Sequence, residues 1–128
     1  MPNFQGVRWL IWWDIDIDYK KGILFIRIIG NFIRSNISKF EERIIPIILE
    51  LTAKKVSINL SNIIMIDNYG LESFIKISNI VNRFNGKVAI CDINNDVNNY
   101  IKSSDVFDYC FKSKNEESVV GVLNIWMI

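Results

Sequence analysis

The residues of this chain whose types and spacing could support recognition chemistry stand together at positions 67–71, where the sequence reads D-N-Y-G-L. An apolar run over 63–66 stops at Asp67, and after Gly70 apolar residues return at helical spacing. This pattern predicts a corner between the end of a strand and the start of a helix. The N–H groups at a helix start lack partners inside the helix and carry a partial positive charge, so a polar or negative group is favoured there.

Each residue of this corner has a structural interpretation beside the functional one. Asp67 has the chemistry of a helix cap, and Asn68 either caps or tolerates left-handed backbone angles. Tyr69 is a candidate anchor for a partner or a plain surface tyrosine. Gly70 permits close packing or a positive φ, and Leu71 belongs in the core. We take these five as the candidate partner-binding residues.

Enzyme chemistry finds little support in the composition. The chain has no histidine, which removes the commonest general base and the usual Ser or Cys triads. Cys91 and Cys110 show no C-x-x-C spacing, so we predict no metal site and two reduced core thiols, with a disulfide as the alternative. There is no G-x-x-x-x-G-K loop, and Asp14, Asp16 and Asp18 have the spacing of a solvated strand face. We therefore predict a protein that is not an enzyme and needs no cofactor.

The bulk numbers fit one globular domain. There are 128 residues, half of them hydrophobic, and 15 basic and 14 acidic residues give a net charge of +1. That balance offers no electrostatic footprint for nucleic acid or an anionic membrane. No signal peptide is evident and no apolar run is long enough for a membrane span, so we expect a cytoplasmic protein without membrane insertion.

Periodicity predicts a series of short alternating elements. Strands over 14–19 and 23–29 form a hairpin, and the helix after it is capped by Ser35 or Asn36 and contains Pro46. The later elements are a strand at 55–60, a helix from 71 that stops at Gly86, a strand at 87–91, a short helix at 94–102 that buries Val97, Tyr100 and Ile101, an apolar turn at 105–111 and a last helix from about 115. This order implies crossovers and a largely parallel sheet with an antiparallel edge.

The two ends of the chain differ from the middle. We expect residues 1–13 to be a Trp-rich arm or extra strand, 14–120 the domain, and 121–128 an apolar tail that finishes the last helix. Tryptophan is enriched in interfaces, so the alternative is that the arm or the tail forms a homodimer surface.

Around the corner the pattern resembles the STAS domain, the fold of bacterial anti-sigma factor antagonists and of the cytoplasmic tails of sulphate transporters. The resemblance runs from about Asp16 to Val119 and depends on V-S-I-N-L-S-N-I-I-M-I-D, then N-Y-G-L, an amphipathic helix, Gly86 and K-V-A-I-C-D-I-N. It implies an α/β fold with a mixed sheet of four to five strands, mostly parallel, and helices mainly on one face.

In the antagonist subfamily the corner usually reads D-S-x-G-L, and the partner anti-sigma factor, a kinase, phosphorylates the serine. Asp67, Gly70 and Leu71 match this pattern, but Asn68 takes the place of the serine and cannot form a phosphate ester. Ser35, Ser61 and Ser73 are the possible substitutes near the same end.

The resemblance implies a regulatory module of transcription by partner switching. It would dock an anti-sigma factor or related kinase-like regulator through the 67–71 loop and the following helix, without phosphorylation at Asn68. One alternative is a structural or regulatory subunit of a transporter or stress-signalling assembly. Another is a sensor of nucleotide or lipid, since some STAS domains are thought to bind such ligands.

Overall fold

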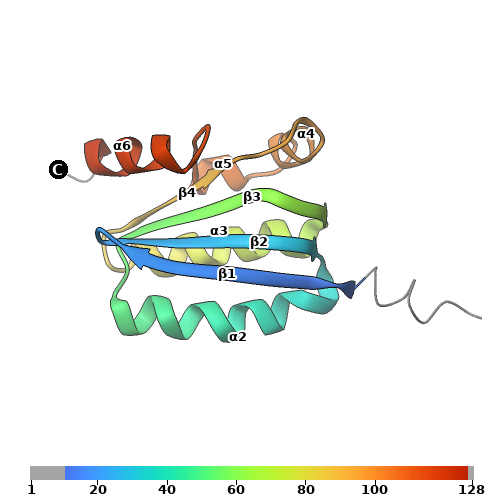
Figure 1. Ribbon diagram of the computed structural model, residues 1–128, viewed down its shortest axis with the longest axis horizontal. Coiled ribbons are helices and arrows are strands. Elements are labelled where there is room, and N and C mark those ends of the chain that lie inside the picture. Colours follow the sequence, from blue (N-terminus) through green and yellow to red (C-terminus); the bar gives the residue numbers. More distant parts are fainter. Residues whose placement is uncertain (1–10, 127–128) are drawn as a thin grey trace, which may run out of the picture.

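The fold follows the predicted order of elements as far as the helix at 94–102, but the predicted apolar turn at 105–111 contains a short helix and the start of a further strand (Figure 1). It is known from a computed structural model, which describes residues 11–126, with the side chains of 125 and 126 left out. The elements are β1 (Trp13–Lys20), β2 (Ile23–Phe32), α2 (Arg34–Leu51), β3 (Lys55–Ile66), α3 (Asn68–Asn82), β4 (Lys87–Cys91), α4 (Asn95–Lys102), α5 (Val106–Tyr109), β5 (Phe111–Lys112) and α6 (Glu116–Trp126). The predicted arm falls largely on 1–10 and the end of the predicted tail on 127–128, outside the described residues, while 121–126 continue α6.

The five strands form one sheet in the order β1-β2-β3-β4-β5. β1 and β2 pair antiparallel as a hairpin, and the other neighbours pair parallel. Lys21 and Gly22 make the hairpin turn with φ of 54° and 75°, the left-handed region that such turns require. The predicted fold class, a mostly parallel sheet with an antiparallel edge, is confirmed.

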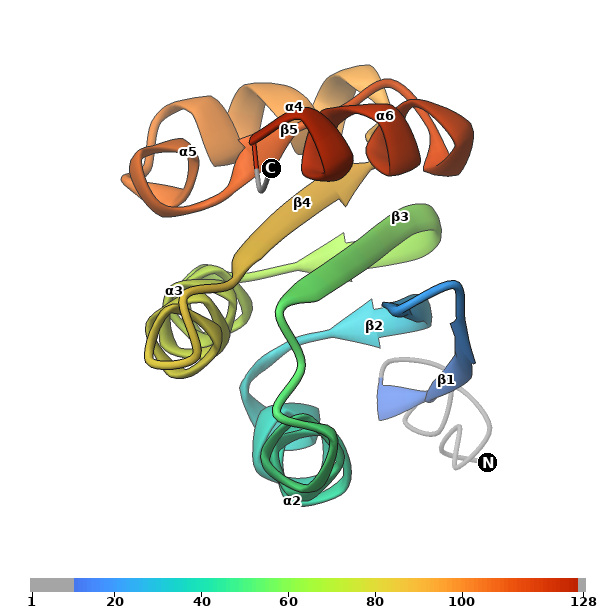
Figure 2. The ribbon, with the colours of Figure 1, turned by 90° about the vertical axis from the view of Figure 1, so that its left-hand side faces the viewer.

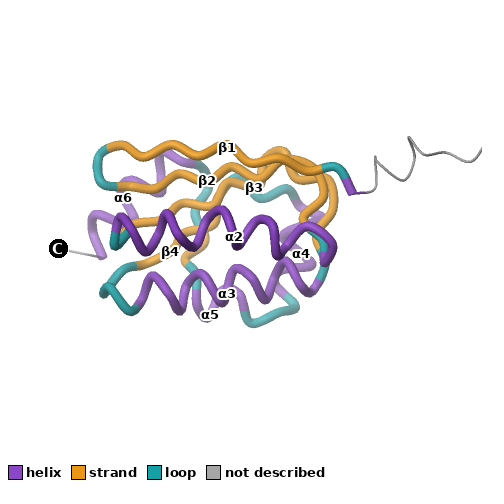
Figure 3. The backbone as a smooth tube through the Cα atoms, turned by 90° about the horizontal axis from the view of Figure 1, so that it is seen from below, coloured by secondary structure: helices purple, strands orange, loops and turns teal. Residues whose placement is uncertain are grey.

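One face of the sheet is covered by α2 and α3, which lie side by side (Figures 2 and 3). The core between these layers is apolar, and at the corner end it contains three fully buried rings. The Phe32 ring lies 4.7 Å from that of Phe40 in α2 and 5.2 Å from that of Phe74 in α3. These rings are the packed support of the segment that joins β3 to α3.

The other face of the sheet carries α6 (Figure 2). A second and smaller apolar cluster fills the space between α6 and β4, and it consists of Ala89, Cys91, Val119 and Leu123, with Phe111 beside it. Cys91 lies in this cluster, whereas Cys110 lies in the main core, and both are free thiols as predicted.

Some element boundaries differ from the prediction. α2 begins at Arg34, so Ser35 and Asn36 are inside it and do not cap it, because the carboxylate of Asp67 takes that role from a distance. Asn36 is buried, and its amide donates to the carbonyl of Asn31. The helix continues without a break through the exposed Pro46.

Two further differences concern the segments on either side of α3. β3 continues to Ile66 as one strand, whereas its pairing with β4 ends at Asn59. α3 ends at Asn82, before the predicted stop at Gly86, and the left-handed residue after it is Asn85, with φ of 60°. Gly86 is instead buried against the backbone of Lys54, where a Cβ would lie 2.6 Å from its Cα.

Candidate functional site

The corner is organised by Asp67, the residue between β3 and α3. Its Oδ1 accepts a hydrogen bond from the backbone N of Gly70 at 3.1 Å, which confirms the predicted cap of α3. Its Oδ2 accepts from the backbone N of Arg34 at 2.8 Å. One carboxylate therefore caps two neighbouring helices and fixes their starts relative to each other.

Gly70 and Leu71 form the inward half of the corner. Gly70 is buried, and a Cβ there would lie 2.8 Å from the carbonyl oxygen of Phe32 and 2.9 Å from Cγ1 of Ile66. Close packing is thus the reason for the glycine. Leu71 is 4% exposed and belongs to the core, as predicted.

Asn68 and Tyr69 form the outward half. Asn68 is exposed, and its Oδ1 accepts a hydrogen bond from the hydroxyl of Tyr100 at 2.5 Å. Tyr69 is 46% exposed, and the Arg34 guanidinium lies 5.1 Å from its ring centre, within the range of a cation–π contact. These contacts hold both tip side chains in place while leaving them open to solvent.

Tyr100 is the residue of this site that sequence reasoning missed. We expected it to be buried with Val97 and Ile101, but it is 36% exposed and reaches Asn68 from α4. Val97 and Ile101 are the buried residues of α4. Tyr100 is three positions after Val97 and shares its helix face by spacing, so the periodicity of the sequence carried no signal that Tyr100 is exposed.

Exposed apolar side chains gather at the corner end of the sheet. The backbone N of Asn31 in β2 donates to the carbonyl of Trp12 at 2.9 Å, and Asn31 pairs with Met65 in β3, so the residue before β1 and the end of β3 flank Asn31 on its two sides. Six large exposed side chains lie here, namely Ile11, Trp12, Ile64, Met65, Tyr69 and Tyr100. Among the described residues only Tyr19, Leu49 and Tyr109 are comparably exposed elsewhere.

The three serines predicted as possible substitutes differ in their surroundings. Ser73 is 2% exposed, and its hydroxyl donates to Oε2 of Glu41 at 2.7 Å. Ser35 and Ser61 are exposed. The structure therefore leaves two of the three hydroxyls open to solvent near this end.

A polar network ties α6 to the sheet on the face opposite α2 and α3. Nε and Nη2 of Arg27 donate to the Glu116 carboxylate at 2.9 and 2.8 Å, and Nη1 donates to Asp16 at 2.8 Å. The amide of Asn59 also donates to Glu116, at 2.7 Å. The hydrogen bonds from Arg27 lower the pKa of Glu116, and the hydrogen bonds to Glu116 raise the pKa of Arg27. Asp16 is thus an ion-pair partner, and we read the network as a structural tie.

The remaining chemistry of the described residues is sparse. Burial raises the pKa of both cysteine thiols to about 12, which keeps them protonated at neutral pH. Within residues 11–126 no cluster of three or more Cys, Asp or Glu side chains is placed to hold a metal ion. In the same part of the chain, no helix combines the length and the apolar character that crossing a bilayer would need.

Comparison with known proteins points to one domain family. The sequence profile of the STAS domain matches residues 14–119. No curated protein matches the chain. A Thermotoga maritima protein assigned as an anti-sigma factor antagonist superposes with a TM-score of 0.80 at 13% identity, over 86% of this chain and 94% of that one. An anti-sigma factor antagonist from Mycobacterium paratuberculosis gives 0.79 at 10% identity, over 88% and 95%.

A larger protein contains a similar domain. The murine anion transporter Slc26a9 matches with a TM-score of 0.71 and 12% identity, over 88% of this chain but only 22% of the transporter chain. At these identities the structural matches describe a shared fold.

Proposed function

Because this chain belongs to the STAS domain family, we propose that it is a non-enzymatic regulatory module that binds another protein through the corner 67–71 and α3. Its partner is an anti-sigma factor or a related kinase-like regulator, and its role is partner switching in the bacterial cytoplasm. The domain proper is 14–120, with the arm 1–13 and the tail 121–128 as its extensions.

The observation that carries this proposal is the unequal distribution of side chains between the two ends of the sheet. The corner end gathers six large exposed apolar or aromatic side chains. The opposite end, with the hairpin turn and the starts of β3 and β4, is lined by lysines at positions 20, 21, 54, 55 and 87. Exposed apolar side chains concentrate at interaction sites, and aromatic residues supply much of the binding energy, so this concentration supports the corner end as the place where a partner docks.

The tip supports a docking role without a phosphate cycle at its centre. Asn68 has no hydroxyl, and its Oδ1 is occupied by the Tyr100 hydroxyl. Its amide N–H groups are therefore the part that faces a partner, as donors. The partner therefore always contacts an uncharged hydrogen-bond donor, the amide of Asn68. This corresponds to the unphosphorylated state of the D-S-x-G-L relatives.

The test compares two exposed tyrosines at opposite ends of the sheet. Tagged wild-type protein, Tyr69→Ala and the control Tyr19→Ala are used to capture proteins from an extract of the native cells. Tyr69 and Tyr19 are 46% and 50% exposed, so neither change should unfold the chain. We expect wild type and Tyr19→Ala to retain an ATP-binding, kinase-like protein, and Tyr69→Ala to retain at least roughly tenfold less of it.

The same partner then tests the tip. Incubation with labelled ATP should leave wild type unlabelled and label an Asn68→Ser variant at position 68. Equal capture by Tyr69→Ala and Tyr19→Ala would contradict docking at the corner. Label in the corner of the wild type would contradict a phosphate-insensitive tip.

A second candidate is a subunit of a larger transporter or stress-signalling assembly. It is supported by the similarity to a part of Slc26a9. A homodimer through the arm or the tail remains a prediction, since most of these residues lie outside the described ones. Co-purification of the chain with a membrane protein from native extract, unaffected by Tyr69→Ala, would favour this candidate.

A further inference from the structure

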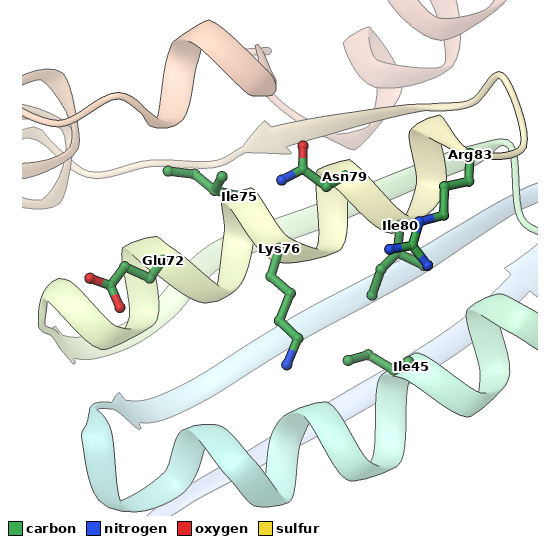
Figure 4. Close-up of a pocket in the computed structure, with 7 residues that line it drawn as sticks. All are labelled: Ile45, Glu72, Ile75, Lys76, Asn79, Ile80 and Arg83. Carbon is green, nitrogen blue, oxygen red and sulfur yellow. The ribbon is translucent and has the colours of Figure 1, made fainter.

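The outer side of α3 carries a shallow groove of about 620 Å³ against α2 (Figure 4). Its residues on the α3 side run from the first turns of the helix to the residue that follows it, and they are Glu72, Ile75, Lys76, Asn79, Ile80 and Arg83. Ile45 of α2 lines the opposite wall. Apolar side chains thus lie between charged ones in a stripe about three helical turns long.

The order of these residues is self-complementary. The midpoint of the set lies between Ile77 and Ser78. Glu72 and Arg83, an acid and a base, lie at equal distances from this midpoint along the sequence. The next matched positions hold two isoleucines, 75 and 80, and the innermost hold Lys76 and Asn79. If a second α3 is laid antiparallel across this stripe, each residue comes level with its match.

The end charges of the stripe are free to make such a pair. Within the part of the chain that the structure describes, the ion pairs involve neither Glu72 nor Arg83. The charge near the centre is already compensated, because Nζ of Lys76 lies 2.8 Å from the carboxylate of Glu41. Two copies of Lys76 therefore do not oppose the pairing, while two new Glu–Arg pairs favour it.

We propose that this groove is a homodimer interface, in which α3 packs antiparallel against α3 of a second copy about a two-fold axis at its midpoint. A two-fold interface uses the same patch on both subunits, so the patch must complement itself. A helix from an unrelated protein would have no reason to meet an acid, two isoleucines around a polar centre, and a base in this symmetric order. The proposed partner also contacts α3, so in this proposal a second copy of the chain and the partner occupy this helix in turn.

Charge reversal tests the proposal with a rescue. Mass is measured by size-exclusion chromatography with light scattering over a dilution series, for wild type, Glu72→Arg, Arg83→Glu and the double variant. We expect wild type to reach twice the chain mass of 15.0 kDa. Each single change places like charges opposite each other at both ends, and should raise the dimer dissociation constant at least roughly tenfold. The double variant restores the Glu–Arg pairs in reverse and should return to within roughly threefold of wild type.

Controls separate this interface from the alternatives. Lys39→Glu reverses an exposed charge on α2 outside the groove and should leave the mass unchanged. Circular dichroism should show all variants folded, since both reversed residues are exposed. Three results would each overturn the proposal. The wild type could be a monomer at every concentration, or the double variant could stay monomeric. The third is a dimer whose dissociation constant does not change in the single variants, as expected of an interface through the arm or the tail. The tyrosine capture experiment tests the corner through Tyr69, which does not line the groove, so failure of the docking proposal is distinguishable from failure of the dimer.

Discussion

On one face of the sheet α2 and α3 are held by the main apolar core, whereas on the other face α6 is held by a smaller apolar cluster and a polar network. The first face buries the stacked and edge-on rings of Phe32, Phe40 and Phe74 completely. The second face has a small apolar cluster under α6 and, beside it, the network of Arg27, Glu116 and Asn59. The side chains of Arg27 and Glu116 are 26% and 24% exposed.

This difference indicates which parts of the molecule move together. Buried aromatic packing is worth several kcal/mol per side chain, while partly exposed ion pairs contribute far less. The corner stands on the apolar face, because Phe32 touches Gly70 and accepts a hydrogen bond from Asp67. The proposed docking tip is therefore rigidly supported, and α6 is the element we expect to open first.

The largest effect should come from removing the support of the corner. Phe32→Ala deletes a fully buried ring between two others, and we expect the free energy of unfolding to fall by about 3–5 kcal/mol. Urea denaturation followed by circular dichroism measures it. Tyr19→Ala, an exposed aromatic residue on β1, should change the value by no more than about 0.5 kcal/mol. Similar losses in both variants would show that the apolar face is not the main source of stability.

The parts of the fold that were predictable from sequence depend on local patterns. The hairpin follows from strict alternation and a Gly-containing turn, and β4 falls on the predicted 87–91 because β-branched residues follow a helix stop. Inside the corner, residue type alone assigned Asp67 to the cap and Leu71 to the core. Each of these features involves residues within a few positions of one another.

The parts that were not predictable join distant residues. The cap of α2 comes from Asp67, which is 33 positions away from Arg34. Tyr100 reaches Asn68 across 32 positions, and Arg27 binds Glu116 across 89. Polar contacts of this kind leave no period in the sequence. They arise only when the topology brings strand ends and helix starts to the same place.

A smaller effect, confined to the polar face, should follow from cutting the tie of α6. Arg27→Met removes the two hydrogen bonds to Glu116, and we expect alkylation of Cys91 in the native protein to become roughly two- to fivefold faster, because a partly exposed pair of this kind is worth on the order of 1 kcal/mol or less. Both thiols have a pKa raised to about 12 by burial, so each reacts at pH 8 only after local opening. Mass spectrometry of the labelled peptides gives both rates.

Cys110 provides the internal control for this experiment. It lies in the main core, where its Sγ is 3.9 Å from the carbonyl oxygen of Phe74, and its rate should not change in Arg27→Met. Arg34→Met, which removes an exposed arginine at the corner, should leave both rates as in wild type. Equal acceleration of the two cysteines in Arg27→Met would mean that α6 does not open independently of the core.

The smallest effect is a pH dependence that belongs to the polar face alone. Hydrogen bonds from Arg27, and then from Asn59, hold the pKa of Glu116 below its unfolded value of about 4.3. A lowered pKa in the folded state means that the unfolded chain binds the proton more readily, so this stabilisation is fully present above about pH 4.5 and is lost as the pH falls through the folded value. Because the pair is partly exposed, the loss is on the order of 1 kcal/mol or less.

Urea unfolding of wild type and Glu116→Gln from pH 6 to pH 3 isolates the contribution of Glu116, since the two proteins have all other carboxylates in common. The variant should lose less stability than wild type over this range. Parallel pH profiles for the two proteins would show that the tie of α6 depends on the shape of the Glu116 side chain and not on its charge.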